Sequence, residues 1–308
     1  MPHSNKKENE GHQPGARVPG YLLAALRRVL SVHKFIKFTT VSGWAMHLRR
    51  KYRTQNSIEV VEFNSSKCPG KSKRRGPKTK PTPEAVAKNN QRRKQRECSR
   101  MVEAYFNEDD GALTLTWEKE KRPKDMKMAI AIFGKFVRWL KREYAKRYYD
   151  LFWIRNIEVG PRGAWHVHMI VNRIEGMELL INDWWTTNCG GVYLQYLRNW
   201  RHQGKDIGEY ISKSARTTKE VVESSWGHSR NVKKVEPEET KITGHRMSDQ
   251  PRVPKGWYLD KNTAYSGESI DGYPFRTYTL RRLKPIPIDH RLKPSQIRKL
   301  QKAKKRTK

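Results

Sequence analysis

The sequence is poor in cysteine and in long apolar runs, and each shortage excludes a class of protein. Its three cysteines, Cys68, Cys98 and Cys189, are odd in number and far apart, which argues against a zinc-ribbon module and favours a reducing compartment. No stretch of about 18 consecutive apolar residues occurs, and residues 1 to 15 are polar, so we expect neither a membrane helix nor a secretory signal. These features predict a cytoplasmic protein with no membrane partner.

The sequence is also poor in hydrophobic residues and lacks a common ATP-binding motif. Only 35% of the 308 residues are hydrophobic, so a packed core can occupy only part of the chain, and we place it within residues 100 to 285. The Gly-x-x-x-x-Gly-Lys-Ser/Thr phosphate-binding loop is missing. We therefore expect no fused ATP-driven helicase.

Acidic residues are scarce relative to basic ones. The 65 lysines and arginines outnumber the 31 acidic residues and give a formal net charge of +34. A surplus of this size exceeds what solubility requires and predicts a polyanionic partner. Charge alone fits a ribosomal-type or other RNA-binding protein equally well, so the distinction depends on particular site residues.

Basic segments flank the predicted core and define four regions. Residues 1–65 form an N-terminal extension, in which residues 21–37 have the apolar spacing of a basic amphipathic helix, to which we assign no function. Residues 66–99 form a basic linker or arm. Residues 100–285 form the core domain, and residues 286–308 form a basic C-terminal tail, of which we expect residues 291–308 to stay mobile until nucleic acid is bound.

Hydrophobic patterns typical of strands and of helices alternate along the core domain. The spacing predicts an α+β fold with a mainly antiparallel central sheet flanked by helices. Asp125 is the expected N-cap of the longest helix, and aromatic residues between 258 and 278 predict a late hairpin. The predicted strands cover residues 112–117, 151–159, 164–172 and 190–197, and the predicted helices cover residues 125–148, 177–188 and 204–216.

A pair of histidines separated by one residue is the most informative motif. Successive strand side chains point to opposite faces, so His166 and His168 share one face of the predicted strand. A three-residue loop at 161–163, with Gly163 in the left-handed conformation, joins this strand to the preceding one and places Glu158 opposite His166. One carboxylate and two neutral imidazoles suit Mg²⁺ or Mn²⁺ and leave positions open for a phosphate oxygen. An isolated pair of this kind equally fits a surface position or a structural zinc site.

Tyr210 and Lys213 form a second motif, in the helix predicted at 204–216. Residues three apart lie side by side on a helix, so the phenol and the ammonium project together, while Ile207 and Ile211 face the core. A Tyr-x-x-Lys sequence is common, and for the motif alone a half-buried helix tyrosine is the more frequent explanation.

Together with a third segment, these motifs resemble the replication-initiator (Rep) branch of the HUH endonucleases, which start rolling-circle replication of plasmids and small single-stranded-DNA phages. The resemblance spans about residues 80 to 285. The tyrosine follows the histidines, as in initiators and unlike relaxases, and Ser214 stands where some initiators have a second tyrosine, so the resemblance is to the single-tyrosine type. The three similar motifs, in family order, are Leu113-Thr114-Leu115-Thr116-Trp117, Gly163-Ala164-Trp165-His166-Val167-His168 and Tyr210-Ile211-Ser212-Lys213.

This resemblance implies an RRM-like palm in residues 100–285 and the activity of a metal-dependent DNA nickase and strand transferase. Tyr210 would attack single-stranded DNA, with Lys213 supplying positive charge beside the phenol, and would form a 5′-phosphotyrosine and a free 3′-hydroxyl. Glu158, His166 and His168 would hold Mg²⁺ or Mn²⁺.

The same resemblance implies DNA contacts and partners. Candidate DNA-binding residues are Thr114, Thr116, Arg162 and Arg230. The expected partners are single-stranded DNA and origin hairpin DNA, together with a host helicase and polymerase, so we expect a DNA-associated protein. Two alternatives stay open: a single-tyrosine HUH transposase acting at insertion-element ends, and a non-catalytic basic nucleic-acid-binding protein in which the histidines hold a structural metal.

Overall fold

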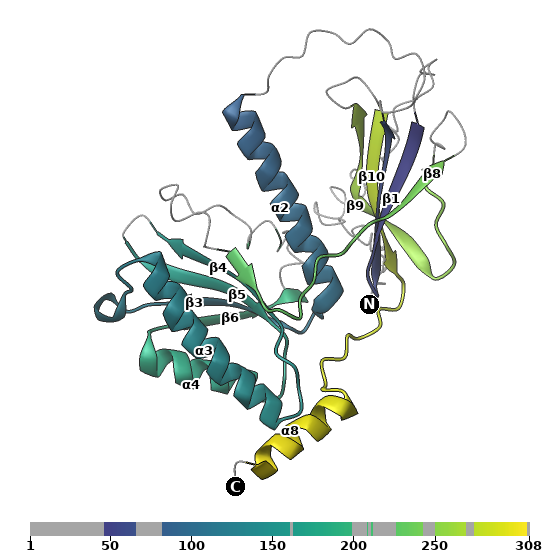
Figure 1. Ribbon diagram of the computed structural model, residues 1–308. Helices are drawn as coiled ribbons and strands as arrows, with labels where there is room; N and C mark the ends of the chain where they lie inside the picture. Colours follow the sequence, from purple (N-terminus) through teal and green to yellow (C-terminus); the bar gives the residue numbers. More distant parts are fainter. Residues whose placement is uncertain are drawn as a thin grey trace, which may run out of the picture.

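The computed structural model describes residues 46–65, 82–160, 163–198, 208, 211, 226–242, 250–268 and 274–306. Within these residues the chain forms two five-stranded antiparallel sheets and four α-helices (Figure 1). The predicted α+β class with a mainly antiparallel sheet is therefore confirmed. The amphipathic helix expected at 21–37 lies outside the described residues. No helix in this part of the chain has both the length and the apolar character that crossing a membrane requires.

The first sheet has the order β6-β3-β5-β4-β7 and contains the predicted strands of the core domain. All four of those strands are present, with ends that lie within two residues of the prediction. The short edge strand β7 was not predicted. The strands are β3 (Gly111–Thr116), β4 (Trp153–Val159), β5 (Trp165–Val171), β6 (Val192–Tyr196) and β7 (Trp226–His228).

The β4–β5 hairpin has the register predicted from its turn. Glu158 pairs with His166 across the two strands. The Gly160 N–H donates to the Ala164 carbonyl (2.8 Å), and Gly163 has the expected left-handed φ of +67°. A slip of one residue would move every side chain of a strand to its other face, so this turn decides which side chains share a face.

Helices α3 (Met126–Lys146) and α4 (Met177–Asn188) cover one face of the first sheet. The side chain of Asp125 accepts a hydrogen bond from the Met128 N–H (2.7 Å), which confirms it as the N-cap of α3. Alternate strand residues pack against the apolar stripes of both helices. The buried core on this face includes Leu113, Leu115, Val167, Met169, Val171, Phe133, Phe136, Leu140, Met177, Ile181 and Trp185.

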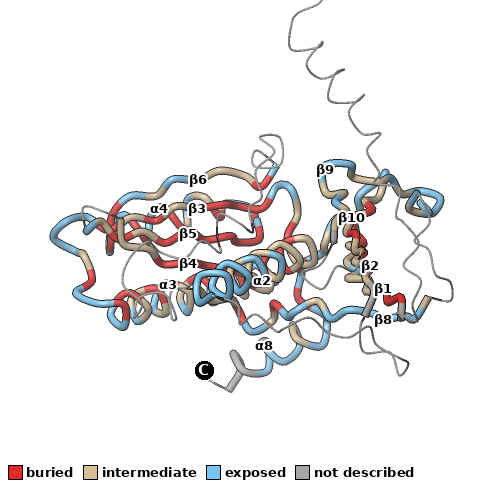
Figure 2. The backbone as a smooth tube through the Cα atoms, turned by 90° about the horizontal axis from the view of Figure 1, so that it is seen from above, coloured by how far each residue is buried: buried red, intermediate tan, exposed pale blue. Residues whose placement is uncertain are grey.

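Helix α2 (Pro83–Tyr105) covers part of the opposite face. Cys98 and Met101 of the helix pack with Ile154 of β4 and Ile170 of β5 in a second buried cluster. Because strand side chains alternate, this is the face that bears the histidine pair. The N-terminal part of α2 is largely exposed, whereas β3, β4 and β5 are buried along most of their length (Figure 2).

The second sheet has the order β8-β1-β2-β10-β9 and joins distant parts of the chain. β2 pairs with β10, so the predicted N-terminal extension and the predicted core domain share this sheet. The aromatic-rich hairpin expected between 258 and 278 corresponds to β9 and β10. The strands are β1 (Met46–Arg53), β2 (Ser57–Ser65), β8 (Glu238–Ile242), β9 (Trp257–Glu268) and β10 (Pro274–Arg282).

Helix α2 packs on the first sheet through apolar side chains and is joined to the second sheet by ion pairs. The Arg100 guanidinium donates to both carboxylate oxygens of Glu59 on β2 (2.6 and 2.9 Å) and stacks on the Tyr52 ring at 3.3 Å. One turn later, Glu103 accepts a hydrogen bond from Arg281 of β10 (3.0 Å). The predicted basic linker thus includes the first part of a helix that contacts both sheets (Figure 1).

The segment after β10 runs back from the second sheet to the first. The side-chain amides of Asn56 and Asn107 each exchange a pair of hydrogen bonds with one backbone residue, Ile286 and Ile288 respectively, at distances of 2.7 to 3.0 Å. Helix α8 (Pro294–Arg306) follows. The predicted C-terminal tail therefore begins with a segment that is hydrogen-bonded to two amide side chains. Most of the part expected to stay mobile forms helix α8.

Candidate active site

Polar side chains gather on the α2 face of the first sheet, in two neighbouring rows across β3, β5 and β4. Directly paired residues of an antiparallel sheet point to the same side. The structure therefore brings together five of the residues that the sequence singled out. The first row is Thr114, His168 and Asn156, and the second row is Thr116, His166 and Glu158.

The His168 imidazole has a partner at each ring nitrogen. Its Nε2 lies 3.4 Å from Glu158 Oε2, and its Nδ1 lies 3.3 Å from Thr114 Oγ1. The residue is only 8% exposed, so these polar partners fix the orientation of the ring. The Thr114 hydroxyl contacts Nδ1, and Nε2 therefore points toward the Glu158 carboxylate. Metal-binding histidines are commonly oriented in this way, by a polar contact at the ring nitrogen that does not bind the metal.

Asn156 is a site residue that was not predicted. It is fully buried, and its Nδ2 donates to Glu158 Oε1 (3.1 Å). The amide thus holds one carboxylate oxygen of Glu158 while the other oxygen faces His168. The signal was present in the sequence, because residues two apart on a strand share a face.

His166 has a different environment. Its ring centre lies 6.5 Å from that of His168, and its Nδ1 is buried without a hydrogen-bond partner among the described residues. Burial is the main reason that the pKa of His166 is lowered; His168 and the positive charge of Arg122 act in the same direction, and Glu158 opposes them. The imidazole is therefore neutral near pH 7, and the neutral form is the one that binds metals.

Arg122 is a second residue that was not predicted. It follows a short 3-10 turn, η2 (Lys119–Lys121), after β3, and its Nε is buried without a partner in the part of the chain that the structure describes. A guanidinium close to His166 brings positive charge to the site, which suits a phosphate group. No local signal distinguishes it from the other basic residues of the sequence.

The donor atoms of the site fit a divalent ion in chemical type. A carboxylate oxygen and two imidazole nitrogens suit Mn²⁺ or Mg²⁺, and the buried, unpartnered Nδ1 of His166 is consistent with a missing ligand. In the orientation observed, no three His, Cys, Asp or Glu side chains of the described residues converge on one metal position. Glu158 and His168 are in contact, and His166 stands apart from them.

The catalytic candidates Tyr210 and Lys213 and the DNA-binding candidate Arg162 lie outside the described residues. Two neighbours of the tyrosine are described. Ile211 is 1% exposed and belongs to the buried cluster between α2 and the first sheet. The backbone at Gly208 passes so close to α2 that an added Cβ would lie 2.1 Å from a side-chain oxygen there. Both positions therefore lie against α2, on the face of the sheet that bears the histidines.

The remaining DNA-binding candidates differ in their contacts. Thr114 Oγ1 contacts His168, as described above. Thr116 Oγ1 instead donates to the Gly191 carbonyl (3.2 Å). Arg230 is exposed in the turn after β7. Of these three side chains, only that of Thr114 has a hydrogen-bond partner within the histidine pair.

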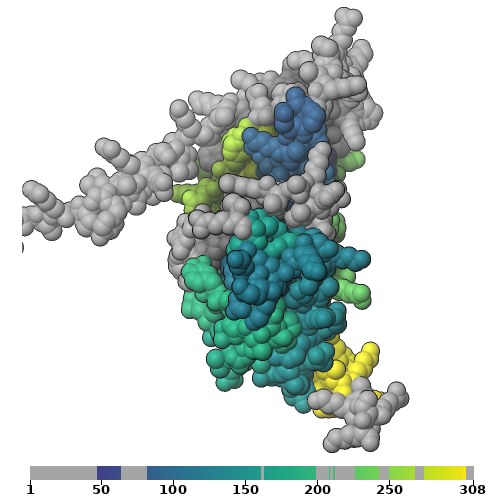
Figure 3. Space-filling model, turned by 90° about the vertical axis from the view of Figure 1, so that its left-hand side faces the viewer, coloured from purple at the N-terminus to yellow at the C-terminus, as the bar shows by residue number. Residues whose placement is uncertain are grey.

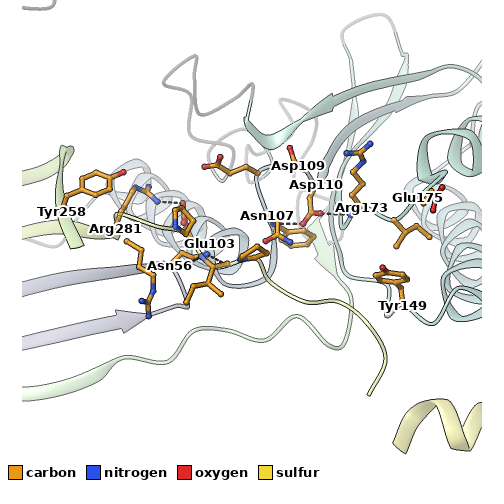
Figure 4. Close-up of a pocket in the computed structure, with 17 residues that line it drawn as sticks. Asn56, Glu103, Asn107, Asp109, Asp110, Tyr149, Arg173, Glu175, Tyr258 and Arg281 are labelled. Carbon is orange, nitrogen blue, oxygen red and sulfur yellow. Dashed lines mark hydrogen bonds and ion pairs between the residues drawn. The ribbon is translucent and has the colours of Figure 1, made fainter. Parts of the chain in front are cut away.

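A cavity of about 670 Å³ lies between the two sheets, away from the histidines (Figure 4). Its lining includes Asp110 and Arg173, next to the β3 and β5 ends that are opposite to His166. The Asp110 carboxylate accepts hydrogen bonds from the Asn107 and Arg173 backbone N–H groups, both at 2.7 Å. Burial raises the pKa of Asp110 to about 6. The cavity is therefore separate from the histidine site.

Comparison with known proteins adds one finding. Residues 110–223 match the family model described as replication-associated protein ORF2/G2P. This segment, less than half of the chain, includes Glu158, His166, His168, Tyr210 and Lys213. No curated protein and no solved structure matches the chain at a significant level. The family match supports a replication initiator.

Proposed function

We propose that this chain is a rolling-circle replication initiator of the single-tyrosine HUH type, which nicks single-stranded DNA at an origin. The family match supports the initiator class. The observation that carries the nicking chemistry is the placement of Glu158, His166 and His168 on one face of the first sheet, within the matched segment. The side chain of Ile211, the residue after Tyr210, is buried between α2 and that same face.

The proposed reaction joins Tyr210 to the DNA and releases a hydroxyl. The phenolate oxygen forms a bond to the phosphorus as the bond from phosphorus to the 3′ oxygen breaks. The phenolic proton passes to solvent, and the leaving oxygen takes up a proton to become a free 3′-hydroxyl. The 5′ end stays attached as a phosphotyrosine, so a later 3′-hydroxyl can reverse the step and transfer the strand.

Basic side chains would assist this step by their charge. A free tyrosine loses its proton only near pH ~10. Lys213, three residues after Tyr210, would favour the phenolate because opposite charges attract. Arg122, close to His166, would neutralise charge on the phosphate oxygens.

Glu158, His166 and His168 would bind Mg²⁺ or Mn²⁺. When bound, the ion would polarise the oxygens of the scissile phosphate. Asn156 would orient Glu158 through its 3.1 Å hydrogen bond, and Thr114 would orient His168 through its 3.3 Å contact. Such orienting contacts fix the tautomer and direction of a metal-binding imidazole.

The proposed partners follow from the reaction and from the charge. Single-stranded DNA and an origin hairpin are the substrates, and a net charge of +34 favours their binding. The free 3′-hydroxyl is a primer for a host polymerase. The sequence lacks a phosphate-binding loop of the helicase type, so a host helicase would open the duplex.

A covalent adduct assay tests this proposal. The full-length protein is incubated with single-stranded oligonucleotides and Mn²⁺, and a protein–DNA adduct is sought under denaturing conditions. We expect an adduct with the wild type and none with Tyr210→Phe, which should still bind DNA. The matched control is Tyr193→Phe, because Tyr193 is a 61% exposed tyrosine that pairs with Thr114 on β3.

Each contrary outcome has a distinct meaning. An adduct formed by Tyr210→Phe but not by Tyr193→Phe would identify a different nucleophile. A wild-type protein that binds single-stranded DNA but forms no adduct would favour the non-catalytic alternative. Cleavage confined to the ends of an insertion element would favour the transposase alternative.

A further inference from the structure

We propose that Trp226 and the facing side chains of α2 form a subsite for one base and one phosphate of single-stranded DNA. The inference rests on the proposed function, because it places another part of the same substrate. Trp226 is the first residue of β7, the edge strand next to β4. It belongs to none of the three motifs and lies outside the segment that matches the family model.

The subsite is a cavity of about 190 Å³ between α2 and β7. Its lining consists of Asn90, Arg93, Lys94 and Glu97 from α2 and Trp226 from β7. Pockets for cofactors and drug-sized ligands span ~300–1,000 Å³. A cavity of this smaller size suits a single ring with its adjoining phosphate.

Trp226 contributes an aromatic ring to the lining of the cavity and carries a buried hydrogen-bond donor. Lys94 Nζ lies 5.9 Å from the ring centre, so a cation stands over one side of the ring. The indole Nε1–H is buried and has no hydrogen-bond partner among the described residues. A buried donor without a partner costs free energy. A base carbonyl or a phosphate oxygen would remove that cost.

The position of Trp226 relative to the histidines fits an extended DNA strand. Trp226 pairs with Asn156 across β7 and β4, and Asn156 pairs with His168 across β4 and β5. The three side chains therefore share one face, and two strand spacings, roughly 10 Å, separate Trp226 from His168. A polynucleotide whose scissile phosphate lies at His168 would reach Trp226 within a few nucleotides.

The charge around the cavity favours a phosphate. Glu97, its acidic residue, is paired with Lys234 (2.7 Å), which leaves Arg93 and Lys94 as the cations of the lining. Burial lowers the pKa of Lys94, so an anion beside this ammonium would be stabilising. The first part of α2 is largely exposed, and part of the helix is visible at the surface (blue in Figure 3). A positive groove combined with an aromatic ring is how proteins bind single strands without reading their sequence.

The first test measures affinity in the absence of chemistry. With EDTA in place of a divalent ion, fluorescence anisotropy gives the Kd of the full-length protein for labelled oligodeoxythymidine. We expect Trp226→Ala to weaken binding about tenfold, and Trp226→Phe, which keeps an aromatic ring, to weaken it less than about threefold. A folded Trp226→Ala protein with wild-type affinity would overturn the stacking role.

Arg93 and Arg92 allow a matched pair of substitutions, and because both side chains are exposed, neither substitution should disturb the core. Both are exposed neighbours on α2, but only Arg93 lines the cavity. We expect Arg93→Ala to reduce the slope of log Kd against log salt concentration by about 1, and Arg92→Ala to leave the Kd within about twofold of wild type. Equal effects of the two substitutions would indicate a diffuse basic surface and overturn the subsite.

A crosslinking experiment separates this inference from the proposed function. An oligonucleotide that carries 5-iododeoxyuridine is irradiated with the protein, and we expect mass spectrometry to place the crosslink at Trp226. The same preparation is assayed for the tyrosyl adduct with Mn²⁺. An adduct without any dependence of binding on Trp226 or Arg93 overturns the subsite and leaves the nicking. Binding that depends on both residues, without an adduct, supports the subsite and overturns the nicking.

Discussion

The carboxylate of Glu158 lies diagonally across the β4–β5 hairpin from His168, with 3.4 Å between Oε2 and Nε2. The residue directly opposite Glu158 is His166. The Glu158 carboxylate therefore contacts His168 and shares one face of the sheet with both imidazoles, while the His166 ring stands apart. Diagonal and direct cross-strand neighbours are set by strand register, so the turn that sets the register also places these three side chains on one face.

Loss of either Glu158 or His168, whose side chains contact each other, should weaken metal binding. Glu158→Gln and His168→Ala each remove one proposed donor, and even the loss of an orienting neighbour costs 10–100-fold in affinity, so we expect Mn²⁺ affinity to fall by about 100-fold. Isothermal titration calorimetry of the full-length protein measures this. Glu118→Gln is the control, because Glu118 is an exposed carboxylate that pairs with Lys121. Unchanged affinity in both site variants would place the metal elsewhere.

Thr114 should affect the metal through His168. Its Oγ1 lies 3.3 Å from His168 Nδ1, so Thr114→Val removes the group that orients the imidazole while keeping a β-branched strand residue. We expect Mn²⁺ affinity to fall about 10–100-fold. Thr116→Val is the matched control, because the Thr116 hydroxyl donates to a backbone carbonyl instead. Equal losses in the two variants would mean that strand β3, and not the contact with His168, is responsible.

Those features of the site that depend on local geometry could be predicted from the sequence. The alternation of side chains places His166 and His168 on one face, and the glycine turn at Gly163 sets the partner strand so that Glu158 joins them. The N-cap at Asp125 is local in the same sense. Each of these depends on residues that are close together in the chain.

Contacts between distant segments could not be predicted in this way. The second sheet pairs β2 with β10, and no local pattern identifies a strand partner so far away in the chain. Trp226 reaches the first sheet by the same kind of long-range pairing, with Asn156. Arg122 approaches His166 through the packing of a loop. Such placements depend on the whole fold, and neither composition nor periodicity encodes them separately.

A buried carboxylate in the second sheet should make one arginine important for stability. Glu62 is fully buried and forms ion pairs with Arg276 and Arg49. Burial by itself disfavours the charged form, but the hydrogen bonds and charges of the two arginines outweigh it and lower the pKa of Glu62. Arg276→Met would leave the carboxylate with one partly exposed partner, so we expect the free energy of unfolding to fall by about 3 kcal/mol.

Arg53→Met is the control for this substitution. Arg53 pairs with Glu238 in the same sheet, but both side chains are about half exposed (47% and 57%), so the expected loss is below about 1 kcal/mol. Urea denaturation measures both variants. If the two losses were equal, Arg49 alone would be sufficient to compensate the charge of Glu62.

Asp110 should make the protein less stable as the pH rises from about 4 to about 6. Burial is the largest cause that raises the pKa of Asp110 from 3.8 to about 6, and the backbone N–H groups of Arg173 and Asn107 only partly oppose it. The folded protein therefore keeps a proton that the unfolded chain has already released. Its free energy of unfolding falls across this pH range, by about 3 kcal/mol once the group is ionised in both states.

The measurement compares wild type with Asp110→Asn, which does not titrate, by urea denaturation at pH values from 4 to 7. The comparison removes the contributions of other groups, including His290 and Asp109, whose charges act on Asp110. We expect the wild type to lose stability relative to Asp110→Asn as the pH rises. Glu118→Gln, which removes an exposed carboxylate that is not among the charges acting on Asp110, should keep a nearly constant difference from wild type. A wild type that instead gains stability relative to Asp110→Asn would mean that the two backbone N–H donors outweigh burial and lower the pKa of Asp110.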